Sequence, residues 1–254
     1  MFIHLLQLGR ISYAEGLDIQ ARVVAARKAG TIGDTLLLLE HPPVITLGRN
    51  ASRANVLASD EWLAQRKVAL FEINRGGDVT YHGPGQLVGY PIMDLRGEFP
   101  NKKGPYLGPV DFVRMMEEAL IRTCGDFGVM AKRIPKCTGV WTFGGGESAD
   151  SDVHERTPEK KLAAIGVHVS QGVTSHGFAL NVTTDLRDFE WIVPCGITDR
   201  GVTSLELEAE DSMDPTMETA INATARNFGR VFGRQMVWCE SLEQLLAQKP
   251  TSSE

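Results

Sequence analysis

The most distinctive stretch of the chain is residues 75–86, Arg-Gly-Gly-Asp-Val-Thr-Tyr-His-Gly-Pro-Gly-Gln. Glycines and a proline stand there beside an arginine, an aspartate, a tyrosine and a histidine, a mixture unusual for a regular strand or helix. The apolar runs Leu70–Ile73 and Leu87–Leu95 flank it, so we expect a loop between two buried strands. Its glycines allow close backbone approach to a ligand, and its larger side chains can line the resulting space. A glycine-rich turn with solvated polar groups is the alternative.

The composition is that of an ordinary globular protein. The 254 residues are 43% hydrophobic and 23% charged, enough for one sizeable core. We expect a single catalytic domain over residues 1–247, with a flexible insertion at 144–159 and a disordered polar tail at 248–254. The net charge of −6 argues against nucleic acid as the main partner. No apolar run approaches the ~20 residues of a membrane-spanning helix.

The cysteines point to a reducing compartment. The four cysteines are scattered without C-x-x-C spacing, which favours reduced thiols in the cytoplasm over disulfides or a zinc site. Cys195 lies between Pro194 and Gly196 and is the best candidate for a nucleophile, whereas an inert thiol is the alternative. A reactive thiolate needs a cationic neighbour, and the candidates are four side chains: Lys161, His82, His176 and Arg75.

Helical periodicity is clear in three segments. Ser12 and Glu15 form a capping box before a helix over Tyr13–Ala29, with Tyr13, Leu17, Ala21 and Val24 on its apolar face. A second helix is expected over Asp111–Phe127 and a last one from Asp214 through Phe232.

Period-two patterns predict the strands. Lys161–Val169 alternates large apolar residues on one face with Ala164, Gly166 and His168 on the other, and the small residues would allow a ligand to approach. Strands are also expected at Met1–Gly9, Thr35–Leu39, Val44–Leu47, Gly139–Phe143 and Phe178–Val182. Hairpins dominate over βαβ units, so we expect an α+β fold with a mixed, largely antiparallel sheet and packed helices.

Common catalytic templates are absent. The sequence has no phosphate-binding G-x-x-x-x-G-K-[ST] loop, no H-E-x-x-H and no G-x-S-x-G elbow. Its histidines lack the spacing of metal ligands. His41 and Arg49 could face a ligand, although a solvated surface role is the simpler interpretation. We therefore expect neither a metal nor a dinucleotide.

Several motifs in order resemble one enzyme family. These are Thr46-Leu-Gly-Arg49, the 75–86 stretch, Lys161-Leu-Ala-Ala-Ile-Gly-Val167, Ser175-His-Gly-Phe-Ala-Leu-Asn181, Pro194-Cys195-Gly196 and Gly201-Val-Thr-Ser-Leu205. Together they are similar to the octanoyltransferases of lipoate biosynthesis. The resemblance implies the fold of biotin and lipoate protein ligases. It also implies transfer of an octanoyl group from acyl carrier protein to a lysine, without a cofactor. This acceptor lysine would belong to a lipoyl domain of a 2-oxoacid dehydrogenase or to the glycine cleavage H protein.

The resemblance also assigns roles to residues. It implies Cys195 as the nucleophile that carries the acyl group and Lys161 as the lysine that tunes the reactivity of this thiol. Lys160 adjoins Lys161, and the choice between the two lysines follows the alignment with Ala163 and Gly166. The implied acyl-binding residues are Arg75, Gly76, Gly77, Asp78, Val79, Thr80, Tyr81, His82, Ala164, Ile165, Gly166, Gly177, Phe178 and Ala179.

Two other functions stay open. An ATP-dependent lipoate or biotin protein ligase would share the fold, and a non-catalytic member would only bind an acylated carrier or a lipoyl domain. Docking of an acidic carrier would need a local basic patch, for which the candidates are Lys102, Lys103, Lys132, Arg133 and Lys136.

Overall fold

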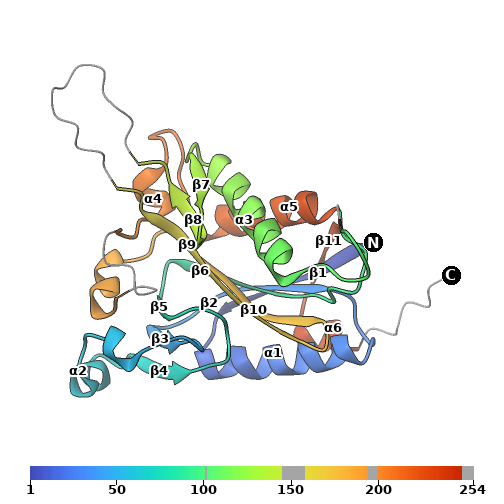
Figure 1. The fold of residues 1–254 in the computed structure, drawn as a ribbon, viewed down its shortest axis with the longest axis horizontal. Helices are drawn as coiled ribbons and strands as arrows, with labels where there is room; N and C mark the ends of the chain where they lie inside the picture. The colour runs from blue at the N-terminus through green and yellow to red at the C-terminus, as the bar shows by residue number, and fades with distance from the viewer. Residues whose placement is uncertain (101, 145–157, 194–199, 248–254) are drawn as a thin grey trace.

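A mixed eight-stranded sheet forms the centre of the molecule (Figure 1). The computed structural model describes residues 1–100, 102–144, 158–193 and 200–247. Along the sheet the strands are β11 (Gln235–Cys239), β1 (Phe2–Arg10), β2 (Thr35–Glu40), β6 (Gln86–Ile92), β10 (Val173–Asn181), β9 (Lys161–Ser170), β8 (Cys137–Thr142) and β7 (Ala131–Ile134). Among the described strands of this sheet, only β1 pairs in parallel, with β11 and with β2, so the expected mixed and largely antiparallel α+β architecture is confirmed.

A second, three-stranded sheet carries part of the distinctive stretch. Its order is β4 (Ala69–Glu72), β3 (Val44–Leu47), β5 (Val79–His82). The expectation of a loop throughout 75–86 was therefore wrong for residues 79–82, which form a buried strand antiparallel to β3. The preceding strand β4 is largely exposed, not buried as its apolar sequence indicated, because it lies at the edge of this small sheet.

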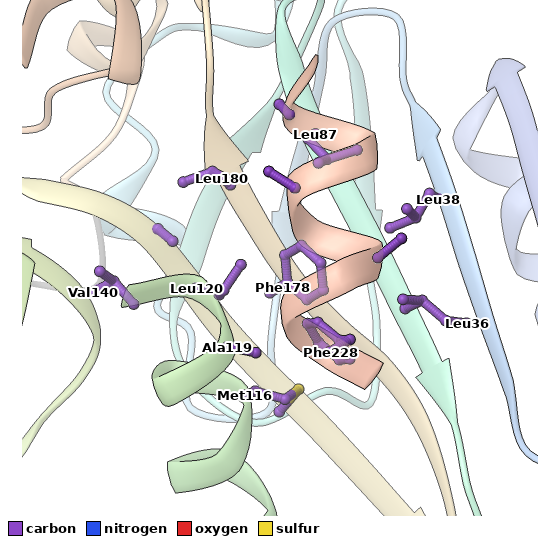
Figure 2. Packing of buried hydrophobic residues seen from close by; sticks show 14 of the residues in the cluster. Leu36, Leu38, Leu87, Met116, Ala119, Leu120, Val140, Phe178, Leu180 and Phe228 are labelled. Atoms are coloured by element: carbon purple, nitrogen blue, oxygen red, sulfur yellow. The ribbon is translucent and has the colours of Figure 1, made fainter. Parts of the chain in front are cut away.

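Apolar side chains of the central strands alternate between the two faces of the large sheet, and both faces are buried. Leu36 and Leu38 of β2 join one core cluster, whereas Leu37 and Leu39 join another on the opposite face. Figure 2 shows Leu36 and Leu38 beside Phe228 in the first cluster. This period of two places successive residues on opposite faces, so the continuous apolar run of β2 reflects helices on both sides.

Helices cover these two faces (Figure 1). α3 (Pro109–Gly125) and α5 (Met217–Phe232) pack on one face, and α1 (Tyr13–Lys28) with α6 (Leu242–Leu246) on the other. The short helices α2 (Asp60–Gln65) and α4 (Leu205–Glu208) and the 3₁₀ turns η1 (Arg53–Asn55) and η2 (Leu186–Trp191) complete the fold. No helix in the described ranges is long and apolar enough to cross a membrane.

The long helices agree with the sequence-based bounds, but the buried face of α1 does not. Ser12 caps α1 through the backbone amide of Glu15, as expected. The buried side of α1 carries Gly16, Ile19, Gln20 and Val23, whereas the expected stripe of Leu17, Ala21 and Val24 is partly or fully exposed. Because Gly16 and Gln20 on the buried side are not hydrophobic, a count of hydrophobic residues does not identify this face as the buried one.

Two further differences concern connections. The composition of Arg96–Pro109, rich in Gly, Pro, Lys and Asn, predicts a surface excursion, but Phe99 and Leu107 of this segment are buried in the main core. Strands β7 and β11 were not expected from the sequence; both are edge strands of the large sheet, where partly exposed residues weaken the apolar pattern. Residues 145–157 of the insertion expected at 144–159, and the tail at 248–254, lie outside the described residues.

Candidate active site

A cavity of about 480 Å³ lies where the small sheet meets the β9–β10 hairpin. Its walls come from α1, from the segment that leads into β5, from β6 and from both strands of the hairpin. The lining residues are Tyr13, Arg75, Gly77, Asp78, Thr80, His82, Val88, Tyr90, Ala164, Ile165, Gly166, His176, Gly177, Phe178 and Ala179. Most of this wall is backbone, small side chain or aromatic surface, which suits an apolar ligand.

Small residues of β9 and β10 allow the backbones around the cavity to come close together. In the hairpin register Ala164 pairs with Ala179 and Gly166 with Gly177. A Cβ atom on Gly166 would lie 2.6 Å from the carbonyl oxygen of Gly76, and one on Gly177 would lie 2.1 Å from that of Gly89. Both distances are far below van der Waals contact, so only glycine fits these positions.

Arg75 fastens the glycine-rich segment to the small sheet. Its guanidinium is buried and donates to the carbonyl oxygen of Thr46 at 2.7 Å and to the Thr46 hydroxyl at 2.9 Å. The backbone amide of Gly76 donates to the carbonyl oxygen of Val167 on β9 at 3.0 Å. The segment therefore bridges the two sheets and closes one side of the cavity.

His82 is held as a neutral imidazole of defined tautomer. Gln86 donates through its Nε2 to Asn181 Oδ1 at 2.9 Å, so its Oε1 faces His82 Nδ1 at 2.8 Å and can only accept. The proton therefore sits on His82 Nδ1 and Nε2 carries the lone pair. Burial lowers the pKa of His82 to about 3, so His82 is not one of the cations expected beside a thiolate.

The same polar network reaches the segment beside Lys161. Asn181 donates through Nδ2 to the carbonyl oxygen of Thr203 at 2.9 Å. Thr203 in turn donates its amide to the carbonyl oxygen of Lys161, and the Lys161 amide donates to that of Gly201. Residues 201–203 thus run along the start of β9 and are tied to the cavity wall.

Lys161 occupies one end of the cavity system. A small adjoining cavity, lined by Lys161, Asn181 and Val202 among others, shares Thr80, Ala164 and Ala179 with the main one. The Lys161 side chain is buried, and its Nζ lies 4.7 Å from the centre of the Trp141 ring, within the range of a cation–π contact. Lys160, in contrast, is half exposed and faces Glu208 at 3.9 Å. The structure therefore distinguishes the two adjacent lysines.

Eleven of the expected acyl-binding residues line the cavity and three do not. Gly76, Val79 and Tyr81 are absent from its wall. Val79 and Tyr81 point into the core of the small sheet, where the Tyr81 hydroxyl donates to Asp188 and burial raises the pKa of Tyr81. This follows from the strand geometry of residues 79–82, which sends alternate side chains to opposite faces. Cys195 lies outside the described residues.

Four lining residues were not expected from the sequence: Tyr13, Val88, Tyr90 and His176. Tyr90 donates its hydroxyl to His41 Nε2 at 2.7 Å, because His41 Nδ1 is 2.9 Å from the carbonyl oxygen of Ile11 and must donate there. His41 is fully buried, so the solvated role considered for it was wrong. A tyrosine hydroxyl in an apolar strand needs a partner, and this was the available sequence signal for Tyr90.

Among the described residues, the remaining thiols and histidines lie away from the cavity or are buried in its wall; Cys239, for example, contacts His4 at 3.5 Å and lines neither the main cavity nor the small one at Lys161. Cys124 is a fully buried core residue, and this burial raises the pKa of its thiol to about 12. Burial also lowers the pKa of His176 to about 4, so His176, like His82, is not a cation near neutral pH. No group of three or more His, Cys, Asp or Glu side chains in the described part of the chain could hold a metal ion.

Comparison with known proteins identifies the family. Residues 12–229 match the model of the lipoyl protein ligase A/B catalytic domain. The chain belongs to this family. Within it, the similar curated relatives are octanoyltransferases: that of Acidobacterium capsulatum is 62% identical over 251 residues, covering 99% of this chain and 98% of the relative. That of Koribacter versatilis is 53% identical and covers 96% of this chain and 90% of the relative. The chain is therefore an acyltransferase of the octanoyltransferase group.

Solved structures of ligases share the fold of this octanoyltransferase family member. A bipartite lipoate protein ligase from Thermoplasma acidophilum superposes with a TM-score of 0.67 at 17% identity, covering 97% of this chain and 91% of that one. A lipoate-protein ligase A bound with ATP superposes with a TM-score of 0.64 at 18% identity, covering 97% and 93%. At such identities the likeness concerns the fold alone, and it confirms the expected ligase-like architecture.

Proposed function

We propose that this enzyme transfers an octanoyl group from octanoyl-acyl carrier protein to a specific lysine of lipoyl domains, through a thioester on Cys195. This would be the first step of endogenous protein lipoylation. The observation that carries the proposal is the position of Lys161, buried at the end of a cavity walled by small and apolar groups. Cys195 precedes Gly201 by six residues, and the Gly201 carbonyl oxygen accepts from the Lys161 amide at 2.9 Å. A span of six residues covers at most about 20 Å, and the proposal requires the Cys195 thiol to come to this end of the cavity.

The chemistry balances with these two residues. The Cys195 thiolate attacks the thioester carbonyl of the donor, a new thioester forms on Cys195, and the carrier thiol departs with a proton from the Lys161 ammonium. The amine of the acceptor lysine then attacks the acyl-Cys195 carbonyl, an amide bond forms, and the C–S bond breaks. Neutral Lys161 takes the proton lost by the amine, which restores the ammonium and thiolate pair.

The cavity wall is suited to binding an apolar acyl chain. Burial of each methylene contributes about 0.8 kcal/mol, so a straight chain gains affinity from every carbon that the wall covers. The neutral His82 presents its Nε2 lone pair as a hydrogen-bond acceptor and therefore cannot donate from this atom to the thioester oxygen.

The basic residues considered for carrier docking are largely engaged within the protein. Lys132 pairs with Glu159 at 3.1 Å, and Arg133 pairs with Glu117 and Glu118. Lys102 donates to the carbonyl oxygen of Gly97 at 2.7 Å. These contacts give no support to that docking patch, and the proposal of an acyl carrier as donor rests on the family and the cavity instead.

The first test is an acyl adduct on Cys195. Incubation of the reduced enzyme with octanoyl-carrier protein, without ATP, is expected to add one octanoyl mass to the intact protein, and a lipoyl domain should remove it. The Cys195→Ala variant should gain no mass. Cys137→Ala is the matched control, because Cys137 is a partly exposed thiol that contacts Arg200 at 3.5 Å; it should load like the wild type.

The outcomes separate the alternatives. A requirement for ATP with a free fatty acid would favour a ligase, and a stable complex with the carrier but no adduct would favour a non-catalytic binding protein. Either result would refute the transfer mechanism.

A second test concerns the two adjacent lysines. Lys161→Ala is expected to slow alkylation of the Cys195 thiol near neutral pH by about tenfold, which corresponds to one unit of thiol pKa. Lys160→Ala should change the rate little, since Lys160 is half exposed and faces Glu208. Rates can be followed with iodoacetamide and peptide mass analysis, and equal effects of the two substitutions would contradict the role of Lys161.

A further inference from the structure

Three cavities follow one another along the β9–β10 hairpin. The small cavity at Lys161 reaches Ala164 and Ala179, and the acyl cavity continues from these residues to Gly166 and Gly177. An outer pocket then begins beyond Gly177, where it reaches Ser170 at the far end of β9. Because β9 and β10 are paired in register, the three spaces lie in a line that starts at the proposed reactive end.

The outer pocket is large and partly apolar. It is larger than the acyl cavity and more open to solvent. Its walls include Leu17, Ala21 and Val24 of α1, which are partly or fully exposed, together with Val173 of β10. An acyl chain that passed beyond the first cavity would therefore find both room and apolar surface.

One side chain belongs to the walls of both the acyl cavity and the outer pocket. Among the described residues, His176 alone lines both spaces. It is buried, with 5% of its surface exposed, and its backbone adopts the left-handed region at φ +56°. This conformation diverts the His176 side chain from the regular alternation of a strand.

Two neighbouring elements hold the His176 ring in place. Its Nε2 lies 2.8 Å from Asn74 Oδ1, which precedes the glycine-rich segment. Its backbone amide donates to Gln20 Oε1 of α1 at 2.8 Å. The ring is therefore fixed from the side of the small sheet and its backbone from the side of α1, and a fixed wall can discriminate ligand length where a mobile one cannot.

We propose that His176 is a specificity-determining residue that closes the far end of the acyl cavity and limits the length of the transferred chain. The inference rests on the proposed function, because it assumes that the acyl chain extends from the Lys161 end. Removing the His176 ring would join the two spaces, so that chains longer than octanoyl extend into the outer pocket toward Val24. His176 would act by exclusion, without taking part in the acyl-transfer chemistry.

The test compares chain-length profiles of His176 variants. His176→Gly suits the left-handed backbone, and His176→Asn tolerates the same conformation with a shorter side chain. The enzyme is offered equimolar octanoyl-, decanoyl- and dodecanoyl-carrier proteins, and the masses loaded are measured on the intact protein. Because each buried methylene is worth roughly fourfold in affinity, the ratio of dodecanoyl to octanoyl loading should rise about tenfold or more in the glycine variant and less in the asparagine variant.

The matched control is Val24→Ala, which enlarges the outer pocket but leaves His176 in place. Its loading ratio should equal that of the wild type. Equal ratios for wild type and both folded His176 variants would overturn the inference, as would efficient dodecanoyl loading by the wild type.

A second measurement separates this inference from the proposed function. Calorimetric binding of free octanoate and dodecanoate to the same variants requires no transfer. If no variant loads Cys195 but His176→Gly gains affinity for dodecanoate alone, the transfer mechanism fails and the barrier role of His176 stands. Suppose instead that octanoyl loads normally and that the His176 variants show the same chain-length dependence of loading and of binding as the wild type. The barrier role of His176 then fails and the transfer mechanism stands.

Discussion

At the scale of single residues, the cavity depends on positions where a methyl group has no room. Gly166 and Gly177 face backbone carbonyls of Gly76 and Gly89 at distances that no Cβ can occupy. Their role is to bring segments close together, which shapes a narrow space without filling it. The residues that do most to shape the cavity are therefore glycines, which carry no reactive side chain.

We expect Gly166→Ala to lower the free energy of unfolding by about 1–3 kcal/mol, because the new methyl group forces the Gly76 carbonyl away. Acyl loading should fall as well, since Gly76 leads into the cavity wall. Urea denaturation and loading by octanoyl-carrier protein measure the two effects. Gly125→Ala is the control, because a Cβ there meets nothing within 4 Å; a comparable loss in both variants would contradict the steric explanation.

At the scale of elements, a buried carboxylate attaches α3 to the β7–β8 hairpin. Glu117 is fully buried in the middle of α3. Its Oε2 accepts from Arg114 at 2.6 Å and from Arg133 of β7 at 3.2 Å, and its Oε1 accepts from the Gly139 amide of β8 at 3.1 Å. The hairpin borders β9, so this contact supports the strand that begins with Lys161.

Glu117→Ala is expected to destabilise the protein by about 2–3 kcal/mol, because it leaves the buried Gly139 amide without an acceptor and removes the partner of two arginines. Glu118→Ala should cost less than about 1 kcal/mol, since that carboxylate is partly exposed and its ion pairs with Arg122 and Arg133 are near the surface. Chemical denaturation of both variants tests the difference; equal losses would show that burial of Glu117 is not what matters.

At the scale of the whole molecule, the cavity lies between two sheets, and buried neutral histidines lie in its wall or beside it. Burial lowers the pKa of His41 to about 4, of His82 to about 3 and of His176 to about 4. In the unfolded chain each would titrate at its ordinary value near 6.5. Below that value the unfolded state binds protons that the folded state does not, so acid favours unfolding.

The free energy of unfolding should therefore decrease as the pH falls from about 7 toward 4, by about 1–2 kcal/mol per buried histidine at pH ~5. Urea denaturation at several pH values measures this slope. His41→Gln replaces one titrating group by a neutral amide and should make the slope shallower. A stability that is constant between pH ~7 and ~5 would contradict the neutral state of these rings.

The sequence alone determined the class of the fold, the bounds of the long helices, most of the strands, the family and the majority of the cavity wall. Local patterns suffice for these features because periodicity reports which side of an element is buried and because the glycine-rich motifs are specific. The same patterns misplaced the buried face of α1, where Gly16 and Gln20 make the tight contacts, and they treated residues 79–82 as loop.

Only the tertiary structure decided which residues share a space. It placed Tyr13, Val88 and Tyr90 in the cavity wall and turned Tyr81 away from it. It distinguished Lys161 from Lys160 by burial, and it placed His176 in the lining of two cavities. The physical reason is that these properties depend on contacts between segments far apart in the chain, such as α1 with β10, and such contacts leave no periodic signal in either segment.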